Sequence, residues 1–586
     1  MRKEFIMQIL VNHMGYSTHG PKKAVVQCCE GETSKQFSVL DHSGQEVFVG
    51  SLRVDGTVAN WKTGSYYTAL FDELETAGRY YIAVDGVRSD IFEIRDSLIT
   101  MRMINAVGYY FKAQRDSGEW KVADHCLPFK GPREGTVDAH GAWYDATGDY
   151  GIHMSHLSHS IYHNPQQVPF SAYTFFKMHE FLTESGNESY SMIKRRALDE
   201  GFFGADFIMR MRAPSGSFFR SINRANALQA VEGTRGIGFE YKRSSSQFSA
   251  KAATADEEII GDENYEVSLR SGGGLAIAAL AIAGRYYYPS AEYSQKEYIQ
   301  SAKAAWHYLR KNNEHYDNDG KWNLVDEYCA LMATTELFRT TGEHEYLQSA
   351  REMAARITAR TEITGEGMRR LYVADGLPYY HAADEGMPVI ALLQYAQIEL
   401  SAAHKAGAIQ LAEEIMRWKL SLSDAQANPF GYPVLEAAYE DGIHVQFFFP
   451  HNSTAAPWWQ GENARIASIS AAAAEVAEVT KDETLKDRCR RMAQDPLDWI
   501  MGLNPFDSCM IEGYGKNNIE YFFQNRYDFL NCPGGIVNGI TSNTHDESGI
   551  EFVAEPTEEV NDNWRWAEQW IPHASWYLYA MALKKE

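Results

Sequence analysis

Apolar and polar positions alternate in short runs along the first part of the chain, up to about residue 95. KKAVVQCC, SYYTALFDEL and GRYYIAV are such runs, and Gly, Asp, Ser and Pro separate them. A period of two is typical of β-strands that bury one face. The pattern predicts a small antiparallel β-sandwich over residues 1–97.

Beyond about residue 100, apolar residues recur every three to four positions, which is the spacing of one helix face. Gly186 and Gly342 stand where the C-terminus of a helix favours a residue with positive φ. The segment GGGLAIAALAIAG at 272–284 is apolar on every side and predicts a buried helix. We therefore expect helical hairpins to fill residues 98–586.

Repeated helical hairpins either stack as an open solenoid or close into a ring. The repeat of about 34 or 40 residues that common solenoids keep is absent here. Long loops rich in Gly and aromatic residues interrupt the helices at about 215–262, 421–462 and 502–563. This pattern favours a ring whose loops build a site on one face, with disorder as the alternative for 242–262.

Composition and charge narrow the possible partners. The chain has 45% apolar and 23% charged residues and a formal charge of −23, which argues against nucleic acid or an anionic membrane as partner. The seven cysteines show no zinc-ligand spacing, and we interpret them as reduced thiols. No apolar run approaches the ~18 residues that cross a membrane.

The N-terminal segment MRKEFIMQILVNHMGY begins with two basic residues, as a signal peptide does. Glu4 and Gln8 interrupt its apolar run, and no small-residue cleavage site follows. We therefore interpret the segment as a first β-strand and expect a cytoplasmic protein.

Two aspartates lie in an aromatic setting in WYDATGDYG. Asp145 and Asp149 are flanked by Trp143, Tyr144 and Tyr150, and the glycine between the aspartates allows a sharp turn. Two carboxylates this close can hold one water together, the better-placed one acting as base. An ordinary Asx turn or helix N-cap would also fit DATGD. The neighbouring Trp143 and Tyr144 are candidate sugar contacts.

A single carboxylate, Glu568, stands among four tryptophans in WRWAEQWIPHASW. Aromatic rings remove solvation from a carboxyl, which raises its pKa and keeps it protonated, as a general acid requires. An exposed glutamate on the last helix is the alternative. Hydrolysis of a glycoside with inversion needs one carboxylate as base and one protonated carboxyl as acid. We therefore predict an inverting glycosidase that uses Asp145, Asp149 and Glu568, with Trp564 as a sugar contact.

These segments resemble glycoside hydrolase family 9, the family of many endoglucanases, in its form with an N-terminal immunoglobulin-like domain. VNHMGYSTHGPKKAVV is similar to the opening strand motif, GAWYDATGDYG to the GGWYDAGD-type aspartate motif, and WRWAEQWIPHASWYL to the segment with the acid glutamate. VDEYCALMATTELFRTTGEHEYL, HNSTAAPWWQGENARIAS and DWIMGLNPF resemble later landmarks. The resemblance covers nearly the full length.

The resemblance implies a multidomain chain in which an all-β immunoglobulin-like sandwich precedes an all-α (α/α)6 barrel. It also implies inversion of the anomeric configuration, with Asp149 as base, Asp145 as its partner on the water and Glu568 as acid. Three upstream glutamates are rival candidates for the acid: Glu555, Glu558 and Glu559.

Two departures from the family pattern bear on the substrate. One more residue separates Asp145 from Asp149 than in the family motif. The typical His-x-Arg sugar-binding motif is missing, and only Arg526 could stand in for it. A changed sugar-binding residue favours a short oligosaccharide over a polymer.

Other candidate contacts are spread along the chain. In PWWQGEN, Trp458 and Trp459 could stack on sugar faces and Glu462 could bind hydroxyls, or the pair could simply be hydrophobic loop residues. His381 in GLPYYHAADEG is a further candidate, although a lone histidine is often structural.

The segment ADHCLPFKG contains Asp124 and His125, which could rim the site or contact a metal. Their spacing proves neither role, so we assign no metal site and expect no cofactor.

The leading hypothesis is an exo-acting β-1,4-glycosidase whose partner is a small oligosaccharide. It places β-glucosaminyl oligosaccharides slightly ahead of cello-oligosaccharides. A lyase or phosphorylase on the same barrel and a non-catalytic sugar-binding protein are the alternatives. The oligomeric state stays open.

Overall fold

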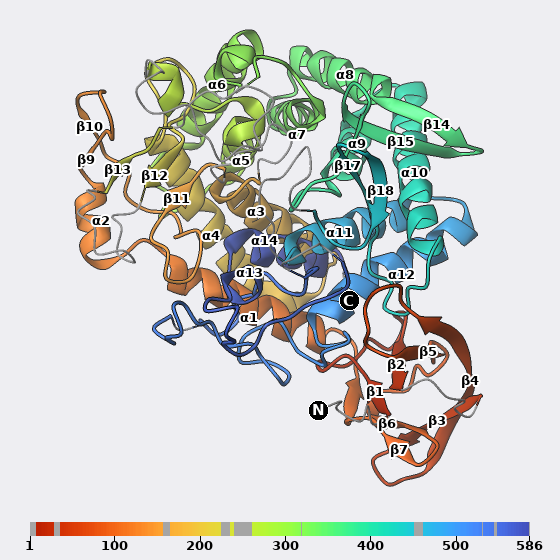
Figure 1. Cartoon of the computed structure of the whole chain (residues 1–586). Helices are drawn as coiled ribbons and strands as arrows, with labels where there is room; N and C mark the ends of the chain where they lie inside the picture. Colours follow the sequence, from red (N-terminus) through yellow and green to blue (C-terminus); the bar gives the residue numbers. More distant parts are fainter. Residues whose placement is uncertain are drawn as a thin grey trace.

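The computed structural model describes residues 7–28, 35–155, 165–223, 235–239, 261–317, 319–450, 461–529, 531–543 and 548–584. Figure 1 shows a small β domain at the N-terminal end of the chain beside a much larger helical domain.

The β domain is an antiparallel sandwich, as predicted. Its strand order is β1-β2-β5-β4-β3-β6-β7, and β8 pairs with β6. The first half of the long strand β4 pairs with β3 and its second half with β5, so that one strand belongs to both layers. The strands are β1 (Gln8–Leu10), β2 (Lys23–Cys28), β3 (Gln36–Asp41), β4 (Glu46–Thr57), β5 (Ser65–Leu70), β6 (Gly78–Val84), β7 (Val87–Arg88) and β8 (Phe92–Ile94).

Six helices of the described chain form an inner ring in the helical domain. Each contacts the next, and the last contacts the first, so the ring is closed. They are α3 (Val168–Glu184), α5 (Gly274–Ala283), α7 (Leu324–Thr341), α9 (Met387–Ile398), α11 (Asn463–Val479) and α14 (Ile571–Ala582).

Among the outer helices, each inner helix packs most extensively against one, which gives six pairs within the described residues. The outer helices are α1 (Leu98–Gln114), α4 (Ser191–Arg210), α6 (Gln295–Tyr316), α8 (His344–Ala359), α10 (Ala402–Asp424) and α12 (Glu483–Ile500). The first of them begins next to the predicted domain boundary. The contacts therefore distinguish a ring from the open solenoid that the sequence left as an alternative.

The sequence explains which helices are inside. All ten residues of α5 are buried, as its uniformly apolar segment predicts. The Asn323 side chain accepts hydrogen bonds from the first-turn N–H groups of α7, and Gly342 ends that helix with φ 69°. Gly186, after α3, has φ 68°. Both glycines occupy the predicted C-terminal positions.

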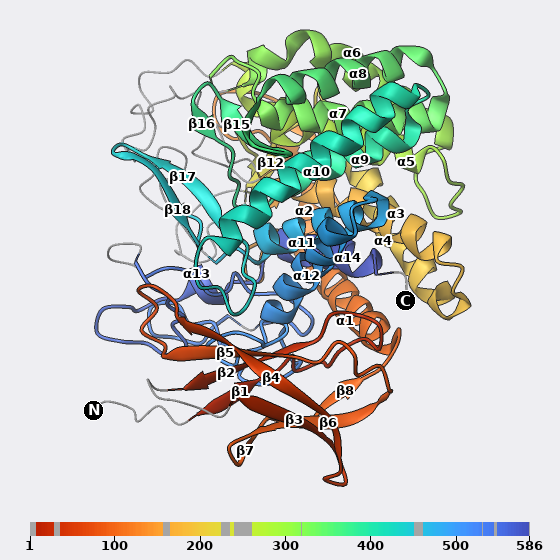
Figure 2. The same cartoon turned by 90° about the vertical axis from the view of Figure 1, so that its right-hand side faces the viewer.

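Shorter elements lie between the long helices. Within the described residues of the predicted loop 502–563, the chain forms turns and isolated bridges. Most of the predicted loop 242–262 lies outside the described residues. Figure 2 shows the hairpin of β17 and β18 projecting from the helical domain. The elements are α2 (Gly118–Asp124), α13 (Trp564–Ala567), β9 (Leu127–Pro128), β10 (Thr136–Val137), β11 (Ile152–His153), β12 (Ser221–Asn223), β13 (Gly236–Ile237), β14 (Thr361–Gly365), β15 (Met368–Ala374), β16 (Leu377–Pro378), β17 (Leu435–Tyr439) and β18 (Gly442–Gln446).

A polar network joins the C-terminal halves of the inner helices. At its centre, buried Glu336 of α7 pairs with Arg339 at 2.7 Å and with Arg285, just beyond α5, at 2.7 Å. Cations suit this end because the helix dipoles direct partial negative charge toward it. The remaining members come from α3, α9, α11 and α14 and are Lys177, Glu180, Gln394, Glu475 and Tyr579.

The β domain docks on the outer helix α12 and the segment after it (Figure 2). Buried Asn12 donates to the Asp498 carboxylate at 2.7 Å, and Lys23 pairs with Asp495 at 2.9 Å. No helix within the described chain is long and apolar enough to cross a membrane. All six cysteines of the described residues are free thiols.

Candidate active site

The two aspartates lie at the ends of a tight turn before β11. The Asp145 N–H donates to the Gly151 carbonyl at 2.9 Å, and the Asp149 N–H donates to the Ala146 carbonyl at 3.1 Å. The Gly151 N–H donates to Asp149 Oδ1 at 3.0 Å. Gly148 has φ 79°, a conformation that favours glycine, so the glycine of DATGD does permit the sharp turn that the sequence suggested.

Backbone hydrogen bonds join this turn to the segment that contains Glu568. The Thr147 N–H donates to the Gln569 carbonyl at 3.0 Å, and the Ile571 N–H, at the start of α14, donates to the Asp145 carbonyl at 2.9 Å. The aspartate turn and the glutamate segment are therefore direct neighbours, although more than 400 positions separate them in the sequence.

The buried phenol of Tyr110, on α1, lies near both acids. Burial is the main cause that raises the pKa of this phenol above its ordinary value, and the charges of Asp145 and Glu568 raise it further. The two carboxylates thus act on one hydroxyl group. The structure brings together the residues that the sequence predicted as acid and as partner of the base.

The Glu568 backbone is held by a chain of buried polar groups. The Asn538 N–H donates to the Glu568 carbonyl at 2.8 Å, and Asn538 Oδ1 lies 2.8 Å from His573 Nε2. His573 Nδ1 accepts the Ala464 N–H at 2.7 Å, so Nε2 must be the protonated nitrogen. Burial lowers the pKa of His573 to about 3, which keeps this imidazole neutral.

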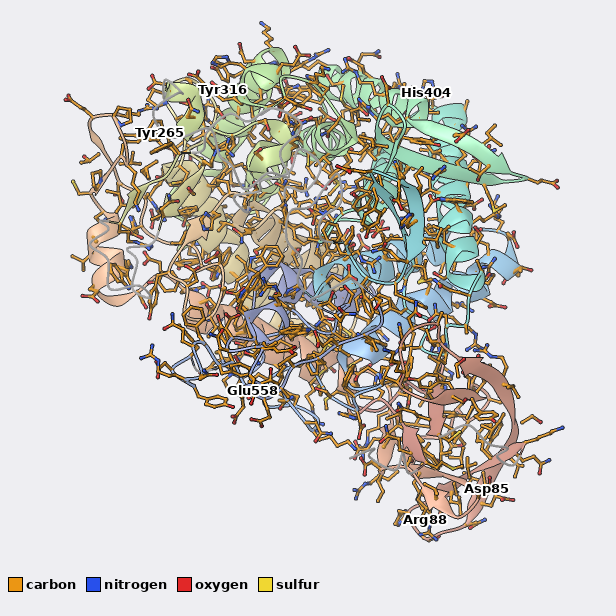
Figure 3. All side chains as sticks on the ribbon, in the orientation of Figure 1. Asp85, Arg88, Tyr265, Tyr316, His404 and Glu558 are labelled. Carbon is orange, nitrogen blue, oxygen red and sulfur yellow. The ribbon has the colours of Figure 1, made fainter. Side chains whose placement is uncertain are left out.

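The three rival acids lie elsewhere. Glu555 accepts a hydrogen bond from the Tyr527 hydroxyl at 3.1 Å, and Glu555, Glu558 and Glu559 are all exposed. Figure 3 shows Glu558 at the edge of the helical domain. Glu568, by contrast, is half-buried beside the aspartate turn.

Two predicted sugar contacts lie inside the core. Trp143 is fully buried, and its indole N–H donates to Glu200 at 3.1 Å. The buried Tyr144 hydroxyl donates to Asp116 at 3.0 Å. Neither ring is open to a sugar, because Trp143 packs against aromatic rings of α1, α3 and α4 and Tyr144 packs edge-on against Tyr150. The prediction that Trp143 and Tyr144 contact sugar is therefore wrong in this structure.

His381 and Glu462 are also buried. His381 Nδ1 accepts the Asp384 N–H at 2.8 Å, and burial lowers the pKa of His381 to about 3. Glu462 pairs with Arg465 at 2.6 Å and accepts the Tyr432 hydroxyl at 2.7 Å. The predicted sugar-binding roles of these two side chains are corrected to structural ones, because both are enclosed and engaged with protein groups.

The remaining sugar-contact candidates differ in position. Trp564 is half-buried at the start of α13, under the Arg565 guanidinium at 4.6 Å from its ring centre. Arg526 is exposed and pairs with Asp528 at 3.1 Å. Trp458 and Trp459 lie outside the described residues.

Two buried side chains near the turn were not predicted. His153, on β11, places Nε2 3.5 Å from Asp145 Oδ2. Arg235, next to β13, binds the buried Asp124 carboxylate with two nitrogens at 2.6 and 2.8 Å and donates to the Tyr150 carbonyl. Asp124 therefore has a structural role, as the ion-pair partner of Arg235, in place of the predicted position at the rim of the site. In the sequence, the one signal for His153 is its place in the short segment DYGIH, which begins at Asp149.

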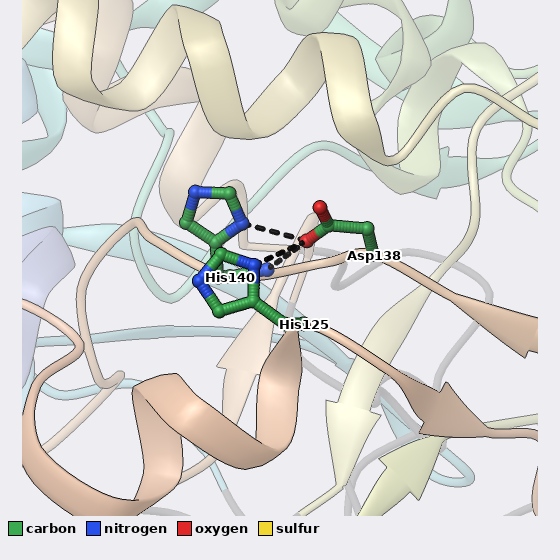
Figure 4. Close-up of side chains that lie close together, drawn as sticks. All are labelled: His125, Asp138 and His140. Carbon is green, nitrogen blue, oxygen red and sulfur yellow. Dashed lines mark hydrogen bonds and ion pairs between the residues drawn. The ribbon is translucent and has the colours of Figure 1, made fainter.

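One group of three possible metal ligands occurs among the described residues: His125, Asp138 and His140 (Figure 4). Asp138 Oδ1 lies 2.6 Å from His140 Nδ1 and 3.4 Å from His125 Nδ1. Two imidazoles and a carboxylate are ligands that Zn²⁺ accepts. The expectation that this chain has no metal site stays a prediction.

The helical domain is thus a closed ring of paired helices, with an acidic turn and a half-buried glutamate beside the N-terminal end of α14. The model of glycosyl hydrolase family 9 matches residues 102–533, and the model of the cellulase N-terminal Ig-like domain matches residues 6–89. The chain therefore belongs to glycosyl hydrolase family 9, as the sequence motifs predicted.

Curated relatives match only part of the chain. A cellodextrinase of Butyrivibrio fibrisolvens is 26% identical over 380 residues, which are 60% of this chain and 61% of the relative. Endoglucanase D of Acetivibrio thermocellus is 22% identical over 383 residues, 61% of this chain and 56% of the relative. The chain thus spans about three fifths of the length of these relatives.

Solved structures match over nearly the whole chain. A metagenome-derived family 9 endoglucanase gives a TM-score of 0.64 with 19% identity, and a Bacteroides ovatus family 9 protein gives 0.65 with 19% identity. Both alignments cover 98% of each chain. At this identity the comparison shows the fold, which is the β domain followed by the helical barrel.

Proposed function

We propose that this protein hydrolyses β-1,4-glycosidic bonds with inversion of the anomeric configuration. Asp149 takes a proton from the attacking water, Asp145 holds the same water, and Glu568 protonates the departing sugar oxygen. The attack forms the bond from the water oxygen to the anomeric carbon as the bond to the leaving oxygen breaks. The proton of the water therefore ends on the Asp149 carboxylate, and the proton of Glu568 ends on the departing sugar oxygen.

One observation carries this proposal: the backbone hydrogen bonds that join Thr147 and Asp145 to Gln569 and Ile571. They bring the aspartate turn beside the Glu568 segment in a chain of family 9. Hydrolysis by inversion needs carboxyls from two such segments on opposite sides of one bond. The rival glutamates, by contrast, are all exposed.

Product NMR tests the stereochemistry. The first product formed from a β-linked disaccharide is expected to be the α-anomer, before mutarotation. A β-configured first product would contradict the water-attack assignment.

We further propose that the substrate is a short oligosaccharide that is trimmed from one end. The name of the Butyrivibrio relative, cellodextrinase, supports short substrates. The two ionised aspartates of the site favour a cationic amino sugar by Coulomb attraction, which supports β-glucosaminyl donors slightly ahead of glucosyl donors. The sugar contacts proposed for this reaction are Trp564 and Arg526, with Trp458 and Trp459.

A panel of disaccharides labelled at the reducing end, with glucosaminyl, acetylglucosaminyl and glucosyl donors, identifies the sugar. Chain-length analysis of longer substrates identifies the mode, because exo action releases single units first. If the glucosyl donor is cleaved faster than the glucosaminyl donor, the amino-sugar preference is wrong. If cleavage requires added inorganic phosphate, the enzyme is a phosphorylase rather than a hydrolase.

A further inference from the structure

Three polar side chains converge on Gly151, directly after the aspartate turn. A Cβ atom placed on Gly151 would lie 2.6 Å from His153 Nε2, 3.2 Å from Asp145 Oδ1 and 3.4 Å from Asp149 Oδ1. The first two distances are shorter than an ordinary van der Waals contact of a Cβ atom, and the third is at the lower limit of one. The α-carbon of Gly151 therefore marks the point where the histidine and both aspartates meet.

The backbone of Gly151 does not itself require glycine. Its φ lies outside the left-handed range, unlike that of Gly148, whose φ is 79°. Alanine would cost little backbone strain at position 151, so the conflict there is with the side chains alone. This places His153 in the same group as the two proposed catalytic aspartates.

The position of His153 is fixed by the fold. It lies on β11, where its Cα pairs with that of Ser221 on β12, and its side chain is 11% exposed. Nε2 is 3.5 Å from Asp145 Oδ2, which is longer than a normal hydrogen bond, and such contacts of catalytic groups often shorten when substrate binds. Asp145 thus directs one carboxylate oxygen toward His153 and the other toward Gly151 and Asp149.

We propose that His153 is a positioning residue for the water-attack step. Its Nε2–H holds Asp145 Oδ2, so that Asp145 Oδ1 and Asp149 Oδ1 face one shared water. A nearby donor also offsets the repulsion between two close carboxylates. This inference rests on the proposed function, because it assumes that Asp145 and Asp149 hold the attacking water.

The proton balance leaves His153 unchanged. Asp149 receives the proton of the water, Glu568 gives its proton to the leaving oxygen, and His153 keeps Nε2–H throughout. The expected effect of losing His153 is therefore on the orientation of Asp145, which lowers kcat and leaves KM nearly unchanged.

Two substitutions distinguish the hydrogen-bond donor of His153 from the volume of its side chain. His153→Leu keeps the size of the side chain and removes the donor, whereas His153→Gln can place an amide N–H near the position of Nε2. We expect His153→Leu to lower kcat about 10–100-fold, as misplacement of a catalytic group does, with KM changed less than about threefold. We expect His153→Gln to retain kcat within about fivefold of the natural enzyme.

Gly151→Ala gives an independent measurement. The added methyl group displaces His153 first, so the substitution should lower kcat at least tenfold in the natural background. In the His153→Leu background it should lower kcat much less, because the orientation of Asp145 is already lost. Equal effects in both backgrounds would contradict the inference.

The outcomes distinguish this inference from the proposed function. Thermal melting and circular dichroism first establish that each variant is folded. If Asp149→Ala retains hydrolysis, the proposed function fails. If Asp149→Ala is inactive but His153→Leu and His153→Gln have the same kcat, at any level, only the role of His153 is overturned.

Discussion

At the C-terminal ends of the inner helices, buried glutamates lie among arginine and lysine side chains. At the N-terminal ends, the aspartates lie on a tight turn whose contacts include a histidine and backbone groups. Burial alone would raise the pKa of Glu336, yet Arg339 and its neighbouring cations hold that pKa below the ordinary value. Buried Glu336 is thus stabilised in its ionised form by neighbouring cations, whereas the acids of the turn are supported by backbone groups and a histidine.

The difference lies in how each acid is supported. At the ion-paired end, arginine and lysine side chains lie beside Glu336 and Glu180 and repay the desolvation of their charges. Glu475, in the same network, accepts hydrogen bonds from Gln394 and Tyr579 instead. At the site end, hydrogen bonds between two loops far apart in sequence position the groups. Paired acids stabilise the ring, whereas the acids on the turn are those that we propose to hold a water. The predictions that follow test this division.

The largest effect is expected from Asp149→Asn. The amide keeps the shape of the side chain but cannot take a proton, so kcat should fall about 10²–10⁴-fold. Stability should change little, because Asp149 is only half-buried on a turn. Hydrolysis of a labelled disaccharide and thermal melting measure the two quantities. Retention of more than a tenth of the activity would contradict the assignment of Asp149 as base.

Glu336→Gln should act on stability instead of activity. The substitution removes the negative charge that Arg285, Arg339 and Lys177 share. This loss should lower the free energy of unfolding by about 3–5 kcal/mol. Specific activity of the folded fraction should stay near that of the natural enzyme. Urea unfolding measures the first quantity.

A matched control for Glu336→Gln is Glu343→Gln. Glu343 pairs with Lys303 at 2.8 Å on the surface and is 42% exposed. Its loss should cost less than about 1 kcal/mol, as exposed pairs do. Equal costs at the two positions would mean that the buried network has no special role.

His573→Gln should reduce the pH dependence of stability. The pKa of His573 is about 3 in the folded chain, against about 6.5 in an unfolded one. Below about pH 6.5 the unfolded chain binds a proton that the folded chain does not, so this residue lowers stability as pH falls. Between pH 7 and pH 5 the natural protein should lose about 2 kcal/mol more than the variant. Parallel curves of unfolding free energy against pH would show that His573 is not buried in its neutral form.

Arg526→Ala should have the smallest effect. The side chain is 63% exposed, so its loss should change stability by less than about 0.5 kcal/mol. As a proposed sugar contact, it should raise KM about 2–10-fold with kcat nearly unchanged. An unchanged KM would remove Arg526 from the binding site.

Local features of the fold followed from the sequence. The spacing of apolar residues indicated the helices, and Gly186 and Gly342 occupy the predicted ends because a positive φ favours glycine there. The turn around Gly148 was predicted for the same reason. These features depend on neighbours within a few positions, which a single sequence contains.

Features that depend on packing were missed. Aromatic residues beside Asp145 suggested a sugar contact, but Trp143 packs inward against aromatic rings of α1, α3 and α4, which are distant in the sequence. Glu462 pairs with Arg465 at the i,i+3 spacing of neighbours on a helix surface. The sequence contains this spacing, so the ion pair could have been predicted. His153 could not be placed, since its direction depends on the pairing of β11 with β12 far along the chain.

The hydrogen bond from Ile571 to Asp145 has a consequence for the order of folding. Synthesis proceeds from the N-terminus, so the aspartate turn leaves the ribosome long before α14, which closes the ring between α11 and α3. Until α14 is made, the turn lacks the neighbour that fixes it, and Glu568, the proposed acid, has only just been added to the chain. A growing chain should therefore be inactive until α14 has emerged, and activity should appear in one step with closure of the ring.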